Sequence, residues 1–148
     1  MKIYTIGHSD LKAEIFFQRL TDFGIKTVID VRSKPYSRYA RWARKKILEQ
    51  ELSNREINYI YLGNELGGKP FEKIIDFYDR ERNPLFVVGI QKLIDIAKSS
   101  DTVILCSEAN PDKCHRKSII GRHLVNRGWE VIHILRNGAT EIQQQTLL

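Results

Sequence analysis

Residues 2–32, KIYTIGHSDLKAEIFFQRLTDFGIKTVIDVR, contain two short apolar runs on either side of an amphipathic segment. The runs Lys2 to Gly7 and Ile25 to Val31 are rich in β-branched residues and have the length of strands. Between them the apolar residues recur at helical spacing, and Gly24 is a typical helix-ending residue. The stretch therefore predicts a strand, a helix and a second strand.

The rest of the chain continues this alternation. Further strands are predicted at 58–62, 102–106 and 130–135, and helical patterns separate them. One apolar stripe at helical spacing consists of Phe71, Ile74, Ile75 and Tyr78. Strands that alternate with helices predict a mostly parallel sheet of about five strands, with right-handed crossovers and helices on both faces. We therefore predict a single three-layer α/β domain over residues 1–148, in which the polar residues 137–148 form a frayed tail.

Length, charge and hydropathy limit the function classes. The chain has 148 residues, 42% hydrophobic and 28% charged, which fits one compact domain. Its 24 Lys and Arg exceed its 18 Asp and Glu, and the net charge of +6 indicates an anionic partner. The longest apolar run, Leu85 to Ile90, is far too short to span a membrane, and the start MKIYTIGHS lacks the features of a secretory signal. We therefore expect no membrane association and a location in the reducing cytoplasm.

Polar residues follow the carboxyl ends of the predicted strands. In open α/β sheets the ligand crevice lies at this edge. The groups that fall there are Gly7-His8-Ser9, Asp30-Val31-Arg32, residues 63–70, Cys106-Ser107-Glu108 and Cys114-His115-Arg116. Because these groups map to one edge of the sheet, we predict that they share a cleft.

The strongest chemical signal is CSEANPDKCHR, residues 106–116, between a strand end and a helix start. The N-terminus of a helix favours negative charge. Together with a neighbouring Arg or His it can lower a thiol pKa from about 8.5 to about 3.5–7.5. Cys106 or Cys114 is therefore a candidate nucleophile or redox thiol, with His115 as base and Arg116 as anion clamp. Glu108 is a candidate general acid or base.

Several alternatives stay open for this loop. Cys106 can be a small buried hydrophobe, and His115 can simply complete the first helical turn. No cofactor is predicted: zinc at Cys106, Cys114 and His115 would lack a CxxC knuckle and a clear fourth ligand, unless the loop of His8 folded over. A phosphatase-type C-x5-R loop is absent, because Asp112 occupies the position of the arginine. A disulfide between the cysteines would close a short loop, but a reducing cytoplasm argues against it.

Two motifs near the amino terminus add polar groups to the predicted cleft. His8 is a candidate for hydrogen bonding to a substrate oxygen or for proton transfer, and its alternative role is a hydrogen bond within its own loop. Asp30 and Arg32 are two residues apart on a strand and so point to the same face. They predict an ion pair, which either holds Arg32 toward the cleft or is purely structural.

Residues 63–69, GNELGGK, match the phosphate-loop pattern G-x-x-x-x-G-K and follow a predicted strand. Pro70 stands where a nucleotide-hydrolysing loop has the Ser or Thr that binds Mg²⁺, and it supplies no N–H group. The sequence therefore argues against such a loop. Gly67 and Gly68 instead predict a tight turn whose backbone approaches a ligand.

The positive charge is concentrated in one segment. The basic residues of residues 32–46 are Arg32, Lys34, Arg38, Arg41, Arg44, Lys45 and Lys46, and the segment has no acid. The rest of the chain has 17 basic against 18 acidic residues. Tyr36, Tyr39 and Trp42 are interleaved with the cations, a combination that is expected where phosphates and bases are bound. The alternative is a solvated helix face in which Trp42 and Leu48 point inward.

Six short motifs occur along the chain, and their combination and order are highly specific. They are TIGHS at 5–9, DVRSKPYS at 30–37, LGG at 66–68, CSE at 106–108, CHR at 114–116 and VIHI at 131–134. On these motifs the chain resembles the domain of unknown function 488 family over nearly its whole length. The resemblance implies a compact α/β domain with a polar rim built from the motifs, and it implies no particular reaction.

Three functions are consistent with these patterns. The first is an enzyme that acts on a phosphate-bearing substrate, a nucleotide or nucleic acid. The predicted site residues are His8, Cys106, Glu108 and His115 for catalysis, and Arg32, Gly67, Gly68, Arg116, Arg38 and Arg41 for binding the substrate or anion. The second is a noncatalytic nucleic-acid-binding module that uses residues 32–46. The third is a thiol redox or metal-binding protein centred on Cys106, Cys114 and His115.

Overall fold

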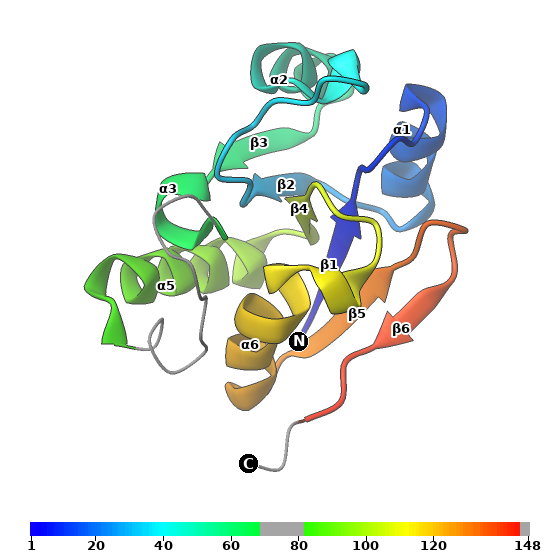
Figure 1. The fold of residues 1–148 in the computed structure, drawn as a ribbon. Helices are drawn as coiled ribbons and strands as arrows, with labels where there is room; N and C mark the ends of the chain where they lie inside the picture. Colours follow the sequence, from blue (N-terminus) through cyan, green and yellow to red (C-terminus); the bar gives the residue numbers. More distant parts are fainter. Residues whose placement is uncertain (69–81, 146–148) are drawn as a thin grey trace.

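The computed structural model describes residues 1–68 and 82–145. Within them one sheet has the strand order β3-β2-β4-β1-β5-β6 (Figure 1). The strands are β1 (Lys2–Gly7), β2 (Thr27–Asp30), β3 (Asn58–Tyr61), β4 (Thr102–Cys106), β5 (Glu130–Ile134) and β6 (Thr140–Ile142). The first five strands are parallel to one another, and β6 pairs antiparallel with β5. The predicted mostly parallel sheet is confirmed.

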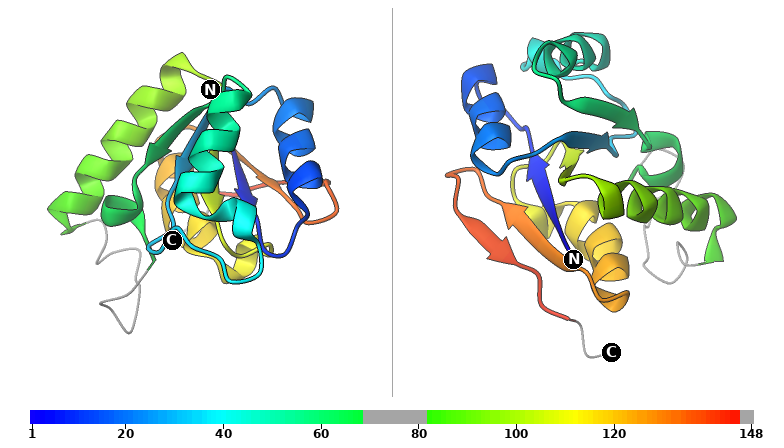
Figure 2. Two further views of the ribbon diagram at one scale, coloured as in Figure 1. Left: turned by 90° about the horizontal axis from the view of Figure 1, so that it is seen from above. Right: turned by 180° about the vertical axis from the view of Figure 1, so that it is seen from behind.

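Helices cover both faces of this sheet (Figure 2). The α-helices of the described residues are α1 (Ala13–Asp22), α2 (Lys45–Asn54), α3 (Gly63–Leu66), α5 (Pro84–Ser99) and α6 (Arg122–Asn126). Shorter elements are the 3-10 turns η1 (Arg41–Ala43) and η2 (Pro111–Lys113) and the π-helix η3 (Arg116–Gly121). The buried residues of α1 and α2 belong to one apolar cluster, and those of α5 and α6 belong to a second. The three-layer α/β architecture is therefore confirmed. None of the helices in the described ranges is both long and apolar enough to cross a lipid bilayer.

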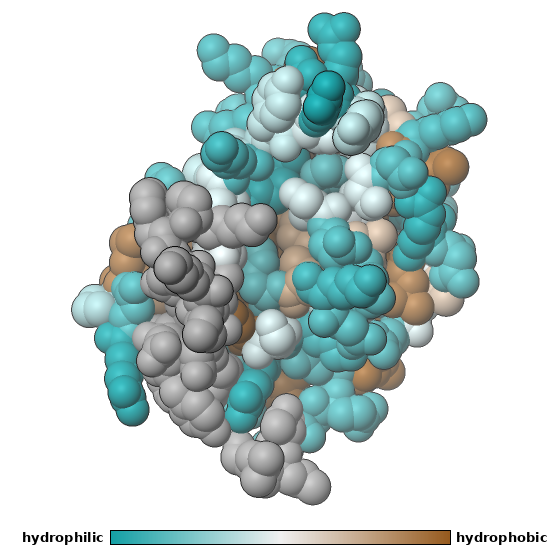
Figure 3. Space-filling view, viewed as in Figure 1, coloured by the Kyte–Doolittle hydropathy of each residue, from teal (hydrophilic) through white to brown (hydrophobic). Residues whose placement is uncertain are grey.

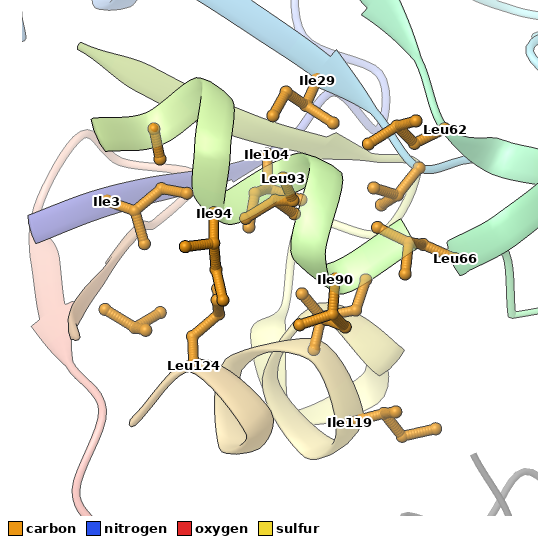
Figure 4. Packing of buried hydrophobic residues seen from close by; sticks show 14 of the residues in the cluster. Ile3, Ile29, Leu62, Leu66, Ile90, Leu93, Ile94, Ile104, Ile119 and Leu124 are labelled. Carbon is orange, nitrogen blue, oxygen red and sulfur yellow. The ribbon is translucent and has the colours of Figure 1, made fainter. Parts of the chain in front are cut away.

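Successive residues of a strand belong alternately to the two apolar clusters, because successive side chains point to opposite faces of a sheet. Val28 of β2 packs with α1 and α2, whereas Ile29 packs with α5 and α6. Figure 4 shows the second cluster, in which Ile94 of α5 lies next to Leu124 of α6. The strands are thus buried on both faces, which is typical of parallel sheets.

Two predicted segments differ from the structure. The tail that was predicted to fray contains β6, and the side chain of Gln143 anchors it: Oε1 lies 2.8 Å from His133 Nε2, and Nε2 donates to Lys117 O at 2.9 Å. The prediction of a frayed tail was therefore wrong for residues 140–142, because tertiary hydrogen bonds hold this polar stretch. The predicted stripe at residues 71–78 lies outside the described residues.

The order of the strands defines where a ligand crevice can form. The central strands β1 and β4 are neighbours, but the chain leaves them in opposite directions, from β1 toward β2 and from β4 toward β5. Gly7 and Cys106 are register partners at the carboxyl ends of these strands. In open α/β sheets ligands bind at such a switch point. The fold therefore places the CSE motif at the edge where a site is expected.

Candidate functional site

A cavity of about 630 Å³ opens between the loops that follow β2 and β4. Among the described residues, its lining combines three cations, two thiols, one imidazole and one carboxylate. The lining residues are Arg32, Ser33, Lys34, Tyr36, Gly68, Cys106, Ser107, Glu108, Lys113, Cys114 and His115. Four of the predicted groups, from the ends of β2 and β4, from the LGG motif and from the CHR motif, thus meet in one place. The cavity is the candidate functional site.

Two reduced cysteines form the floor of this cavity. Cys106 ends β4 and is 1% exposed, and Cys114 is 8% exposed. Cys114 Sγ donates a hydrogen bond to Cys106 Sγ over 2.8 Å, and Arg116 Nη1 donates another to the same sulfur over 2.7 Å. Both donors stabilise negative charge on Cys106, which makes it the more acidic of the two thiols.

The pKa values of the two thiols move in opposite directions. Burial raises the pKa of the Cys106 thiol, but the hydrogen bond from Cys114 and the charge and hydrogen bond of Arg116 outweigh it, and its pKa falls to about 7. The hydrogen bond to Cys106 raises the pKa of Cys114, and burial raises it further. At neutral pH about half of Cys106 is therefore ionised, and Cys114 keeps its proton.

Arg116 acts on the protein rather than on the cavity. Its side chain is fully buried, and besides Cys106 it donates to the carbonyl oxygens of Glu108 and of Ala109, the latter at 2.9 Å. A Cβ atom at Gly7 would overlap the Glu108 carbonyl and lie 2.5 Å from Arg116 Nη1. The glycine of the TIGHS motif therefore makes room for the guanidinium. Arg116 holds the loop after β4 around the thiolate, and it is not among the residues that line the cavity.

The predicted ion pair between Asp30 and Arg32 is present and fully buried. Arg32 Nε and Nη2 each donate to one carboxylate oxygen of Asp30 at 2.8 Å, which is a bidentate arrangement. Tyr59 donates its hydroxyl to Asp30 Oδ2 at 2.6 Å, and burial and the nearby carboxylate raise the pKa of this phenol above its usual range. The guanidinium is thus fixed where it borders the cavity.

His8, which directly follows β1, completes this network. Its Nδ1 lies 2.9 Å from the carbonyl oxygen of Ser9 and its Nε2 lies 3.3 Å from Arg32 Nη1. With the proton on Nδ1, the ring donates to Ser9 and accepts from Arg32. Burial lowers the pKa of His8 to about 4, the hydrogen bond to Ser9 opposes this, and the charge of Arg32 adds to it. His8 is therefore neutral at neutral pH, and it contacts the cavity through Arg32.

The glycines of the LGG motif allow close approach to the site. A Cβ atom at Gly68 would lie 3.0 Å from His115 Nδ1, and one at Gly67 would lie 2.5 Å from Ser33 Oγ. His115 Nδ1 in turn lies 3.6 Å from Cys114 Sγ. Gly68 thus places the backbone against the imidazole that borders the two thiols. Pro70, the residue that argues against a phosphate loop, lies outside the described residues.

A family model described as Domain of unknown function DUF488 matches residues 12–122. The chain belongs to the DUF488 family. The matched range includes the DVRSKPYS, LGG, CSE and CHR motifs, whereas TIGHS at 5–9 and VIHI at 131–134 lie outside it. Neither the search of curated proteins nor the search of solved structures found a match.

The structure of this DUF488 chain brings together part of the predicted site. Arg32, Gly68, Cys106, Glu108 and His115 line the cavity. The remaining predicted residues lie elsewhere. Three of them lie next to lining residues without lining the cavity themselves, namely His8, Gly67 and Arg116. The other two, Arg38 and Arg41, are exposed in the segment that leads to α2.

Other residues of the DUF488 site were missed by sequence reasoning. Tyr59 reaches Asp30 because β3 is the neighbour of β2, a pairing that no local pattern predicts. Lys113 also lines the cavity and was not predicted, whereas Lys34 and Tyr36, which line it as well, were predicted only as members of the basic segment 32–46. The signal that could have found Lys113 is its position next to the CHR motif. Within residues 1–68 and 82–145, no group of three or more His, Cys, Asp or Glu side chains is arranged to hold a metal ion.

Proposed function

We propose that this DUF488 protein is an enzyme in which the Cys106 thiolate is the nucleophile toward a phosphate-bearing substrate held in the cavity. One observation carries the proposal. The sulfur accepts hydrogen bonds from Arg116 Nη1 and Cys114 Sγ and at the same time lines a cavity that contains three cationic side chains. A stabilised thiolate next to anion-binding groups is the arrangement that nucleophilic chemistry on an anionic substrate requires.

The cations of the cavity differ in their roles. Lys34 and Lys113 are exposed and supply mobile charge for phosphate oxygens. Three hydrogen bonds of Arg32 are directed to Asp30 and His8. These bonds fix the orientation of the Arg32 guanidinium, which borders the cavity with its positive charge.

The acid–base groups of the reaction come from the loop after β4 and from the CHR motif. His115 borders both the cavity and Cys114, and it serves as the proton acceptor or donor nearest to the thiols. Glu108 Oε1 accepts a hydrogen bond from Asn110 N at 3.2 Å, and its exposed carboxylate borders the cavity. It serves as the second acid–base group, closest to solvent.

The test is protection of Cys106 from alkylation. We expect inorganic phosphate to slow the reaction of Cys106 with iodoacetamide, measured by mass spectrometry of the peptide that contains it. Replacing Lys34 and Lys113 together by Gln removes two charged hydrogen-bond donors, which weakens protection about tenfold or more. The matched control is Lys46→Gln, an exposed lysine of α2 that does not line the cavity. Absence of phosphate protection in the unmodified protein would overturn the proposal.

A second candidate function, binding of single-stranded nucleic acid, is favoured by the residues that precede α2. Tyr36 is 58% exposed and Tyr39 is 85% exposed. Arg44 lies over the ring of Tyr36 at 4.4 Å, and Arg38 lies over Tyr39 at 5.8 Å. Exposed rings beside cations are the features on which bases stack and phosphates bind. Figure 3 shows hydrophilic side chains over this part of the molecule, at the top of the view.

The alternative interpretation of this segment is a solvated helix face in which Trp42 and Leu48 point inward. It also has support, since Leu48 is fully buried and Trp42 Nε1 donates to Leu11 O at 3.1 Å. Reversing the charge of two arginines therefore distinguishes nucleic-acid binding from a solvated helix face. We expect Arg38→Glu with Arg41→Glu to reduce retention of a single-stranded oligonucleotide and to flatten its salt dependence. Retention that is unchanged by both reversals would end this second candidate. Cys106→Ala serves as the control that leaves binding intact.

A further inference from the structure

We infer that Cys106 and Cys114 form a redox-active dithiol that a hydroperoxide converts into an intramolecular disulfide, with Cys114 as the resolving thiol. The inference rests on the proposed role of Cys106 as the nucleophile. The two sulfur atoms lie 2.8 Å apart, and both cysteines are reduced. A disulfide bond is about 2.05 Å long, so a further approach of about 0.75 Å closes the bond.

The hydrogen bonds assign the order of events. Arg116 Nη1 and Cys114 Sγ both donate to Cys106 Sγ, so the negative charge is located on Cys106. The thiolate is the form that attacks an oxidant, and Cys106 therefore reacts first. Cys114 is held within contact of the same sulfur and keeps its proton until that sulfur has been oxidised.

Burial limits the oxidants that reach Cys106. Its side chain is 1% exposed, and the cavity that it lines has a volume of about 630 Å³. The disulfide of another protein cannot approach a sulfur that is enclosed in this way, whereas the terminal oxygen of a hydroperoxide can. Arg116 Nη1 donates to the same sulfur over 2.7 Å and stabilises the thiolate that attacks this oxygen.

The first step converts Cys106 to a sulfenic acid. The thiolate attacks the terminal oxygen of the hydroperoxide, an S–O bond forms and the O–O bond breaks. The remaining alkoxide, or hydroxide from hydrogen peroxide, takes a proton from water. In this step the sulfur loses two electrons and the peroxide gains them.

The second step closes the disulfide. Cys114 Sγ transfers its proton toward His115 Nδ1, which lies 3.6 Å away, and attacks the sulfur of the sulfenic acid. The S–S bond forms, the S–O bond breaks, and hydroxide leaves as water with that proton. The sum is one hydroperoxide and two thiols giving an alcohol, or water, together with water and one disulfide. A small-molecule dithiol reduces the disulfide and restores both thiols.

The inference is tested with equimolar hydrogen peroxide, followed by intact-mass analysis and non-reducing peptide mapping. The wild-type protein is expected to lose two hydrogens in mass and to give one peptide pair linked between Cys106 and Cys114, reversed by dithiothreitol. Cys114→Ser is expected to accumulate a sulfenic acid that dimedone traps. Cys106→Ser leaves only a thiol of ordinary or higher pKa, and its peroxide consumption at neutral pH is expected to fall about 15-fold or more.

His115→Gln separates the two steps, because the ring acts on the proton of Cys114 and not on Cys106. We expect this variant to accumulate more dimedone-trapped sulfenic acid than the wild-type protein and to close the disulfide more slowly, with an altered pH profile. Gain of oxygen without loss of hydrogen in the wild-type protein, or a disulfide between two molecules, would overturn the inference. If Cys106 alkylates as a thiolate but no internal disulfide forms, only the redox inference fails. If Cys106→Ser reacts like the wild type, the proposed function fails as well.

Discussion

Replacing Cys114 by alanine tests how the thiolate is stabilised. Its S–H group donates to Cys106 Sγ at 2.8 Å, and this hydrogen bond is the largest of the contributions that lower the pKa of Cys106. A hydrogen bond to a charged group contributes about 1.5–3 kcal/mol, and S–H is a weak donor, so we take about 1.5 kcal/mol. That corresponds to about 1 pKa unit. The pKa of Cys106 is therefore expected to rise from about 7 toward about 8 in Cys114→Ala.

The assay is the rate of iodoacetamide alkylation of Cys106 against pH. At neutral pH the thiolate fraction falls from about one half to about one tenth for a rise of about 1 pKa unit, which is about a fivefold slower reaction. Cys114→Ser is the matched control, since its hydroxyl keeps a donor at the same position and should keep the pKa low. An unchanged pKa in Cys114→Ala, or equal shifts in the alanine and serine variants, would refute the assignment of this hydrogen bond.

Three further variants test the surroundings of the site. Gly7→Ala should push Arg116 away from the thiolate and so raise the pKa of Cys106, measured by alkylation. It should also lower the free energy of unfolding in urea by about 1–3 kcal/mol. Wild-type values of the pKa and of the unfolding free energy would contradict the close packing at Gly7. Asp30→Asn leaves the guanidinium of Arg32 buried without its carboxylate and should cost about 3–5 kcal/mol in the same measurement, and a loss below about 1 kcal/mol would show that the pair is not buried in solution. Burial lowers the pKa of His133 from 6.5 to about 4. As the pH falls, His133 is therefore protonated in the unfolded chain before it is protonated in the folded protein. The free energy of unfolding should therefore decrease between pH 6.5 and 4, and His133→Gln should remove up to about 3 kcal/mol of that decrease; equal pH slopes would contradict it.

The sequence predicted the elements of the fold better than their arrangement. The strand β1 and the strand β4 were predicted with the bounds that the structure has, because β-branched runs and turn residues are local signals. The strand β6 was missed, since its three residues are held by pairing with β5 and by the side chain of Gln143. Strand order depends on the packing of helices between strands, and no local pattern contains it.

The candidate site was predictable as a set of strand ends but not as a set of contacts. The carboxyl ends of parallel strands meet at one edge, so the thiol of Cys106 and the guanidinium of Arg32 could be placed near each other. The direction of Arg116 depends on the space that Gly7 leaves on the neighbouring strand, which only the tertiary structure shows. Arg38 belongs to the same basic segment as Lys34, but it lies over Tyr39 and away from the cavity.

The most direct test of the site is the ultraviolet absorbance of thiolate as a function of pH, with dithiothreitol removed and both cysteines reduced. We expect a transition of one thiolate with a midpoint near pH 7 in the wild-type protein, and its loss in Cys106→Ser. A midpoint near the ordinary thiol pKa of about 8.5 in the wild-type protein, or a low-pH transition that persists in Cys106→Ser, would contradict it.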